Sequence, residues 1–231
     1  MNITNEYSSD FCKVGMAERY ARKFTNRVDT IRHEVELRVL KRYAYGKLFD
    51  CSIGTGRFIN GLSGVEYHGM DYSLEMIDYV NKHYPKVQTK IGDLSKWIED
   101  DSCTYDTTIC VRTLHAIDAR LAISEMVRIT KHGGLIIFDY GTNSEYALTS
   151  NGSKVLINYL NINQILSNFN VKKVAVHNLD SWLIRLLVLN KKWFYLFCGK
   201  YNFIGNNVWI WAERLLCQHG YRKLYILKKE M

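Results

Sequence analysis

Residues 47–73 read KLFDCSIGTGRFINGLSGVEYHGMDYS, and this stretch decides the fold. It begins with a short apolar run, residues 48–51, which predicts a buried strand. A turn with Gly54 and Gly56 follows, then a brief helical piece and a second apolar run that ends at Asp71. Glycine lets a backbone approach a ligand closely, and the free N–H groups at a helix start face polar ligand atoms. Because an acid at the tip of the second strand can accept bonds from both hydroxyls of a ribose, the pattern predicts a nucleoside-binding site.

The same stretch also carries a family resemblance. FDCSIGTGRF, residues 49–58, resembles the first motif of class I S-adenosylmethionine (SAM)-dependent methyltransferases, which usually reads acid-x-Gly-x-Gly-x-Gly. GMDYSLEMID, residues 69–78, is similar to their ribose-binding strand end and the helix after it. One position departs from the family pattern, because Ser52 stands where the first glycine of the turn is usual. The resemblance covers residues 46–140 and continues, in order, through IGD at 91–93, YDTTICVRTLHAI at 105–117 and KHGGLIIFDY at 131–140.

The competing interpretation is a dinucleotide-binding fold, whose fingerprint is G-x-G-x-x-G with an acid about 20 residues further on. The turn here reads GTGRFI from Gly54, so the third glycine is absent. Asp50 before the turn and the Gly92-Asp93 pair after the third predicted strand favour SAM. An NAD-dependent oxidoreductase is therefore the less favoured alternative. A catalytically silent SAM-fold binding protein is the other, and the Ser52 departure supports it.

The resemblance implies that SAM is the cofactor and S-adenosylhomocysteine the product. It implies that Asp93 binds the adenine amino group and that Leu94 lies beside the ring. In related methyltransferases a segment like AERYARKF, residues 17–24, lies over the cofactor, so we expect Tyr20 at the methionine end. The full set of expected cofactor residues is Tyr20, Asp50, Cys51, Ser52, Gly54, Thr55, Gly56, Asp71, Tyr72, Met76, Asp93, Leu94, Cys110 and Val111.

Apolar runs alternate with amphipathic stretches along the chain. This alternation predicts an α/β fold: a doubly wound, mostly parallel seven-stranded sheet with helices on both faces. The family resemblance adds that the last two strands form an antiparallel pair at one sheet edge. Ligands of such sheets bind outside the carboxyl ends of the strands. The predicted strands are 48–51, 67–70, 86–91, 105–111, 135–140, 171–177 and 221–227, and the predicted helices are 30–43, 73–83, 118–133 and 153–166.

The length and composition predict a single domain spanning residues 1–231. The start of the chain lacks the apolar run of a signal peptide, and the six cysteines are scattered without a C-x-x-C pair. We therefore expect a cytoplasmic protein without disulfides or structural zinc. Within the domain we expect an N-terminal helical segment (1–45), a cofactor-binding core (46–180), an aromatic, basic helical cap (181–220) and a last strand (221–231).

The formal charge of +8 lies at the two ends of the chain. Residues 1–45 carry nine basic and six acidic residues, and residues 181–231 carry nine and two. Segment 181–220 holds four of the five tryptophans. Arg185 and the run 190–192 interrupt its apolar stretches, so each stretch is too short to span a membrane. We favour a cap over an acceptor pocket. The alternatives are peripheral contact with a membrane surface and a homodimer face.

Methyl transfer from SAM is an in-line displacement, in which the protein supplies alignment and, for an oxygen acceptor, a general base. His115 is the candidate base because it follows the fourth predicted strand and an imidazole titrates near neutral pH. The alternative is that His115 only shapes the pocket. No metal is expected, since the seven histidines are dispersed without ligand spacing. The expected acceptor-binding residues are Arg112, Tyr140, Asn143 and Trp182.

The sequence also narrows the class of acceptor. The single proline excludes the N/D-P-P-Y/F/W motif of methyltransferases that act on DNA bases, and no basic run interleaved with aromatics lies near the predicted site. We therefore expect no nucleic-acid partner. A small-molecule, sugar or lipid-linked acceptor remains, with O-methylation expected. The basic ends of the chain favour an acceptor that carries phosphate or carboxylate, although solubility alone would also explain them.

Overall fold

The computed structural model describes residues 11–23, 27–141, 145–148, 154–157, 161–179 and 222–231. The helices are α2 (Met16–Lys23), α3 (Arg27–Tyr43), α4 (Leu74–His83), α5 (Ala119–Ile129) and α6 (Ile162–Leu166), with a 3-10 helix at Ile59–Gly61. The strands are β1 (Lys47–Asp50), β2 (Glu66–Asp71), β3 (Gln88–Ile91), β4 (Tyr105–Cys110), β5 (Thr130–Gly141), β6 (Glu145–Leu148), β7 (Lys154–Ile157), β8 (Val171–Leu179) and β9 (Arg222–Lys229).

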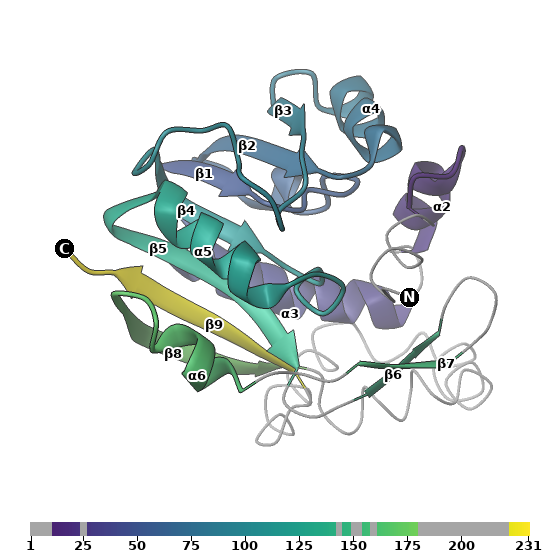
Figure 1. Ribbon diagram of the computed structural model, residues 1–231. Helices are drawn as coiled ribbons and strands as arrows, with labels where there is room; N and C mark the ends of the chain where they lie inside the picture. The colour runs from purple at the N-terminus through teal and green to yellow at the C-terminus, as the bar shows by residue number, and fades with distance from the viewer. Residues whose placement is uncertain (1–10, 24–26, 142–144, 149–153, 158–160, 180–221) are drawn as a thin grey trace, which may run out of the picture.

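Seven strands form one mixed sheet in the order β3-β2-β1-β4-β5-β9-β8. The five neighbouring strands β3, β2, β1, β4 and β5 pair in parallel, whereas β9 is antiparallel to both β5 and β8. In Figure 1 the yellow β9 lies between β5 and β8, so the last strand is one place in from the sheet edge. The prediction of a mostly parallel seven-stranded sheet that ends in an antiparallel pair is confirmed.

Helices cover both faces of this sheet (Figure 1). Successive strand residues point to opposite faces. Phe49 and Ile136 join the buried cluster of α5 and α6, while Leu48 and Ile137 join the cluster of α3 and α4. Because both faces are covered, the central strands β1 and β4 are buried at nearly every position, including the polar Thr107 and Thr108 of β4.

The carboxyl ends of the parallel strands meet at one edge of the sheet. Strand β1 ends at Asp50, β2 at Asp71 and β4 at Cys110. Since β9 runs antiparallel to β5, its first residue, Arg222, pairs with Gly141 at this same edge. The loops after β1, β2 and β4 therefore lie along the same border of the sheet as the start of β9, and we call this border the carboxyl edge.

Two predicted helices are wrong in part. Residues 154–157 form strand β7, which pairs with β6 in a separate two-stranded sheet, and the helix after it spans only 162–166. The short apolar run KVLI fits a strand as well as a helix, so its periodicity misled the prediction. Helix α5 begins after the predicted cap, Asp118, but ends at Ile129. Thr130 already has extended dihedrals and begins β5, four residues after Met126, whose carbonyl accepts its hydroxyl.

The predicted helical cap at 181–220 lies outside the described residues, as do Asn143 and Trp182. In the part of the chain that the structure describes, no helix is both long and apolar enough to cross a membrane.

Candidate functional site

The glycine turn after β1 is held against the neighbouring strand ends. The Gly54 N–H donates to Asp71 Oδ2 at 2.8 Å, and the Ile53 N–H donates to the Met70 carbonyl at 2.9 Å. Gly54 and Gly56 have positive φ values of 53° and 73°. A Cβ on Gly56 would lie 2.5 Å from Ile59 Cδ1, so this position needs glycine for both conformation and space.

Asp71 is oriented entirely by backbone N–H groups. Its Oδ2 accepts from Gly54, and its Oδ1 accepts the Ser73 N–H at 3.0 Å. Burial raises the pKa of Asp71, and the N–H groups of Ser73, Gly54 and Tyr72 offset part of that rise. Ser73 also caps α4 by accepting the Met76 N–H. The carboxylate is thus fixed at the end of β2, between the glycine turn and the start of a helix.

Asp50 lies beneath the turn and is 3% exposed. Its two oxygens accept the Tyr67 hydroxyl at 2.7 Å and the Ser52 N–H at 3.1 Å. Burial raises the pKa of Asp50 to about 6, although the bonds from Tyr67 and Ser52 oppose the rise. Because Asp50 is buried and bonds to Ser52 of the turn and Tyr67 of β2, it links the turn to the neighbouring strand.

Ser52 adopts no left-handed backbone conformation, since Cys103 and Arg112 are the non-glycine residues with positive φ in the described part of the chain. A serine is therefore accommodated without backbone strain where the family usually has glycine. Its hydroxyl lies 3.6 Å from the Cys110 sulfur. Burial raises the pKa of the thiols of Cys51 and Cys110, which therefore act as small apolar groups.

Helix α2 docks on the same edge and brings Tyr20 to the turn. The Tyr20 ring would lie 3.8 Å from a Cβ placed on Gly54, and the Phe11 ring meets it edge-on at 5.7 Å. Two further bonds fix this segment, from the Ser73 hydroxyl to the Phe11 carbonyl at 2.7 Å and from the Gly15 N–H to Glu75 at 3.2 Å. The structure thus brings Tyr20 next to the glycine turn.

Asp93 opens the loop after β3. Its Oδ1 accepts both the N–H and the hydroxyl of Ser95, at 3.0 and 2.5 Å, and Lys96 lies 3.5 Å from Oδ2. Burial opposes ionisation, but the bonds from Ser95 and the charge of Lys96 outweigh it and lower the pKa of Asp93. The remaining expected cofactor residues divide by exposure: Tyr72 is exposed, whereas Thr55, Met76, Leu94 and Val111 are buried.

Arg112 follows β4 with a φ of 69°, an unusual conformation for a residue with a side chain. Its N–H donates to Asp139 Oδ1 at 2.5 Å, and its Nε donates to Glu36 Oε1 at 3.0 Å. The guanidinium of Arg112 thus contacts Glu36 on α3.

Glu36 is the centre of an ion cluster that the sequence analysis missed. It is fully buried and accepts bonds from three arginines, from Arg57 Nη1 at 2.6 Å, Arg112 Nε at 3.0 Å and Arg222 Nη2 at 2.5 Å. Arg222 also pairs with Asp139 at the end of β5. Burial alone would raise the pKa of Glu36, but Arg112, Arg57 and Arg222 hold it well below its usual range. We call Glu36, Arg57, Arg112, Asp139 and Arg222 the Glu36 cluster.

One signal in the sequence could have pointed to this cluster. Glu36 is an acid between the buried apolar positions of α3, next to Leu37 and one turn before Leu40. Such an acid requires a positive partner. The partners come from segments far away in the chain, so their identity was not readable.

His115 lies in the loop that follows β4, directly after the buried Leu114. A turn closed by the Ala116 N–H and the Thr113 carbonyl, at 2.8 Å, places it partly buried beyond the carboxyl edge. Tyr140 is 5% exposed near the end of β5. Among the residues that the structure describes, no group of three His, Cys, Asp or Glu side chains could hold a metal ion.

A shallow groove of about 420 Å³ lies between α2 and α4. It is lined by Glu18, Ala21, Arg22, Tyr79, Lys82 and His83. None of the expected cofactor residues lines it, so it is separate from the carboxyl edge.

Comparison with known proteins agrees with this geometry. Residues 49–138 match a family model described as a methyltransferase domain. A search of curated protein sequences gives no significant match.

Solved structures with this fold cover nearly the whole chain. A SAM-dependent methyltransferase from Thermotoga maritima, described as a possible histamine N-methyltransferase, is 16% identical and has a TM-score of 0.63 over 97% of this chain and 100% of its own. A Haloferax volcanii methyltransferase in complex with the activator Trm112 is 14% identical, with a TM-score of 0.66 over 97% of this chain and 98% of its own. At these identities the likeness concerns the fold.

A third solved structure has two small molecules bound. The Haemonchus contortus phosphoethanolamine N-methyltransferase 2 is bound to phosphomonomethylethanolamine and S-adenosylhomocysteine. It is 16% identical and has a TM-score of 0.56 over 84% of this chain and 52% of its own.

Proposed function

We propose that the chain is a class I SAM-dependent methyltransferase, which transfers a methyl group from SAM to a small-molecule, sugar or lipid-linked acceptor. One observation carries the proposal: the bond from the Gly54 N–H to the Asp71 carboxylate, which fixes the glycine turn beside the end of β2. A ribose at this position would find an acid for its hydroxyls and backbone N–H groups close by. SAM supplies the reactive methyl group, and the protein supplies binding and alignment.

The cofactor would lie along the carboxyl edge. Asp71 would accept the ribose hydroxyls, and Asp93 would accept the adenine amino group through Oδ2, since Ser95 occupies Oδ1. Tyr20 would close over the methionine end, because it already lies against Gly54. Asp50 and Ser52 would act indirectly, by holding the turn in shape.

We propose His115 as the general base for an oxygen acceptor. Its place in the loop after β4, past the carboxyl edge, supports this role. His115→Ala should lower turnover by about 100-fold or more while the SAM dissociation constant changes less than about threefold. His132→Ala is the matched control, because His132 is exposed and lies near the first residues of β5, at the other end of that strand. Unchanged turnover of His115→Ala with the true acceptor would remove His115 from the mechanism.

We further propose that the acceptor is anionic and that no metal is needed. The basic ends of the chain support an anionic acceptor, and the Haemonchus enzyme offers a precedent for a phosphate-bearing one. The candidates for acceptor binding are Arg112, Tyr140, Asn143 and Trp182. Methyl-labelled SAM incubated with matched hydroxyl compounds, with and without phosphate or carboxylate, tests the preference. Equal labelling of neutral and anionic members would contradict it, and loss of labelling with a chelator would contradict metal independence.

Residues 181–220 belong to the proposal as well. We propose that they cap the acceptor pocket, with peripheral membrane contact and homodimerisation as the other candidate roles, in a cytoplasmic protein. Trp182→Ala should then raise the acceptor KM without changing the SAM dissociation constant. Co-sedimentation with anionic vesicles or a dimeric mass in solution would favour one of the other roles.

A further inference from the structure

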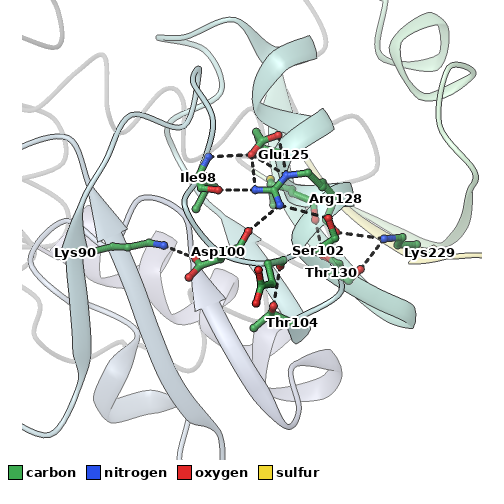
Figure 2. Close-up of polar contacts among 11 residues, drawn as sticks. Lys90, Ile98, Asp100, Ser102, Thr104, Glu125, Arg128, Thr130 and Lys229 are labelled. Carbon is green, nitrogen blue, oxygen red and sulfur yellow. Dashed lines mark hydrogen bonds and ion pairs between the residues drawn. The ribbon is translucent and has the colours of Figure 1, made fainter.

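The loop from β3 to β4 is tied to the last turn of α5 by one arginine (Figure 2). Arg128 Nη2 donates to the Ile98 carbonyl at 2.6 Å, and Nη1 donates to the Asp100 carbonyl at 2.8 Å. Glu125, one turn earlier on α5, accepts from Arg128 Nε at 3.1 Å and Nη2 at 2.8 Å. It also accepts the Ile98 N–H at 3.0 Å. The pair therefore holds both backbone polar groups of Ile98.

Further contacts hold the rest of the loop to the same helix turn. The Cys103 N–H donates to the Arg128 carbonyl at 3.0 Å, and the Thr104 N–H donates to the Ile129 carbonyl at 2.8 Å. The Trp97 ring stacks 3.7 Å from the Arg128 guanidinium, although Trp97 is 69% exposed. This stack shields one face of the guanidinium.

The loop that Arg128 holds begins with the expected adenine site. Leu94 and Ile98 are both buried in the hydrophobic cluster that also contains Met126 of α5. Asp93 lies one residue before Leu94, and its carbonyl accepts the Lys96 N–H at 2.9 Å. A shift of Ile98 would therefore move Leu94 and turn the Asp93 carboxylate.

We propose that Arg128, braced by Glu125, is a positioning residue for the adenine end of the cofactor. The inference rests on the proposed function, because it assumes that Asp93 receives the adenine amino group. Arg128 would not touch the cofactor. It would fix the position of Asp93 through Ile98 and Leu94, and the planar guanidinium is suited to hold two carbonyls and a carboxylate at once. A lysine cannot reproduce that geometry.

The test compares two ligands that differ in the group that Asp93 would read. S-Adenosylhomocysteine carries an amino donor on its base, whereas S-inosylhomocysteine carries a carbonyl acceptor. Calorimetry on the full chain should show that the wild type prefers the adenosine ligand by about tenfold or more, because the carbonyl would leave the carboxylate without a donor. Asp93→Asn should reduce this preference.

Arg128→Lys should reduce the preference by about threefold or more, while affinity for the inosine ligand changes less than about twofold. Arg120→Lys, on the exposed first turn of α5, is the matched control and should keep the wild-type ratio. Glu125→Gln is the second variant, in case Arg128→Lys does not fold. In the Asp93→Asn, Arg128→Lys double variant, the preference should fall no further than in Asp93→Asn alone.

Equal weakening of both ligands in Arg128→Lys and Glu125→Gln would overturn the inference, since that is the result of a purely structural role. An unchanged preference in both would overturn it too. If the wild type binds neither ligand, the proposed function fails, and the positioning role fails with it. If the wild type binds S-adenosylhomocysteine but the variants weaken both ligands equally, only the positioning role is contradicted and the proposed function stands.

Discussion

The carboxyl edge has two halves, a cofactor half with Asp50, Gly54 and Asp71, and a β9 half that is formed by the Glu36 cluster. The two halves are built from different interactions. In the cofactor half, carboxylates accept backbone N–H groups from nearby residues: Asp50 is two residues from Ser52, and Asp71 is 17 residues from Gly54. Next to β9, side chains pair over long separations, such as 186 residues between Glu36 and Arg222. The first half is therefore encoded in a short motif, whereas the second exists only once the sheet has formed.

The largest effect should come from breaking the β9 half at its centre. Glu36→Gln keeps the shape of the side chain but leaves three arginines around a neutral group. Removing one partner of a buried ion pair costs about 3–5 kcal/mol, and we expect a loss of that size in the free energy of unfolding. Denaturant unfolding measures it, with Glu34→Gln on the same helix as control. A loss below about 1 kcal/mol would mean that the Glu36 cluster does not hold this half together.

In the cofactor half, Asp50 should make the free energy of unfolding depend on pH. Because the folded-state pKa of Asp50 is raised to about 6, its contribution to stability is fully present below the ordinary pKa of about 3.9 and is lost as pH rises through about 6. Asp50→Asn cannot titrate. The difference in unfolding free energy between wild type and Asp50→Asn should therefore change by about 2 kcal/mol between about pH 4 and about pH 7, in the direction of a less stable wild type. A difference that is constant with pH would contradict the assignment.

The smallest effect should come from restoring the family's glycine. Ser52 has no left-handed backbone, so Ser52→Gly relieves no strain and adds freedom to the unfolded chain. We expect a loss of about 0.5–1 kcal/mol in unfolding free energy and a SAM affinity within about twofold of wild type. A large gain in SAM affinity would show that the serine weakens cofactor binding.

Much of the fold could be predicted from the sequence. Short apolar runs such as residues 48–49 and 135–138 mark the central strands, and the glycine turn at 54–56 and the capping residues Ser73 and Asp118 mark where elements begin. The prediction failed where a short apolar run fits two structures, at 154–157. The prediction also placed the end of α5 too late. It took the glycine pair at 133–134 as the end of the helix, whereas the backbone is already extended at Thr130.

The candidate site was predictable only on its cofactor side. Asp71 and Gly54 were found because their spacing belongs to one motif, and the structure brings them within a hydrogen bond of each other. Glu36 carries a local signal, as an acid among apolar positions of α3, but its partners Arg57 and Arg222 carry none, since only the folded sheet brings them to it.

The most direct test of the central claim is calorimetric titration of SAM and NAD into the wild type, Asp71→Ala and the control Asp78→Ala on the exposed side of α4. We predict that the wild type binds SAM in preference to NAD and that Asp78→Ala matches it. Asp71→Ala should lose about tenfold or more in SAM affinity, because charge-assisted hydrogen bonds to a ribose contribute about 1.5–3 kcal/mol. Preference for NAD, or SAM binding that Asp71→Ala leaves unchanged, would contradict the account at its centre.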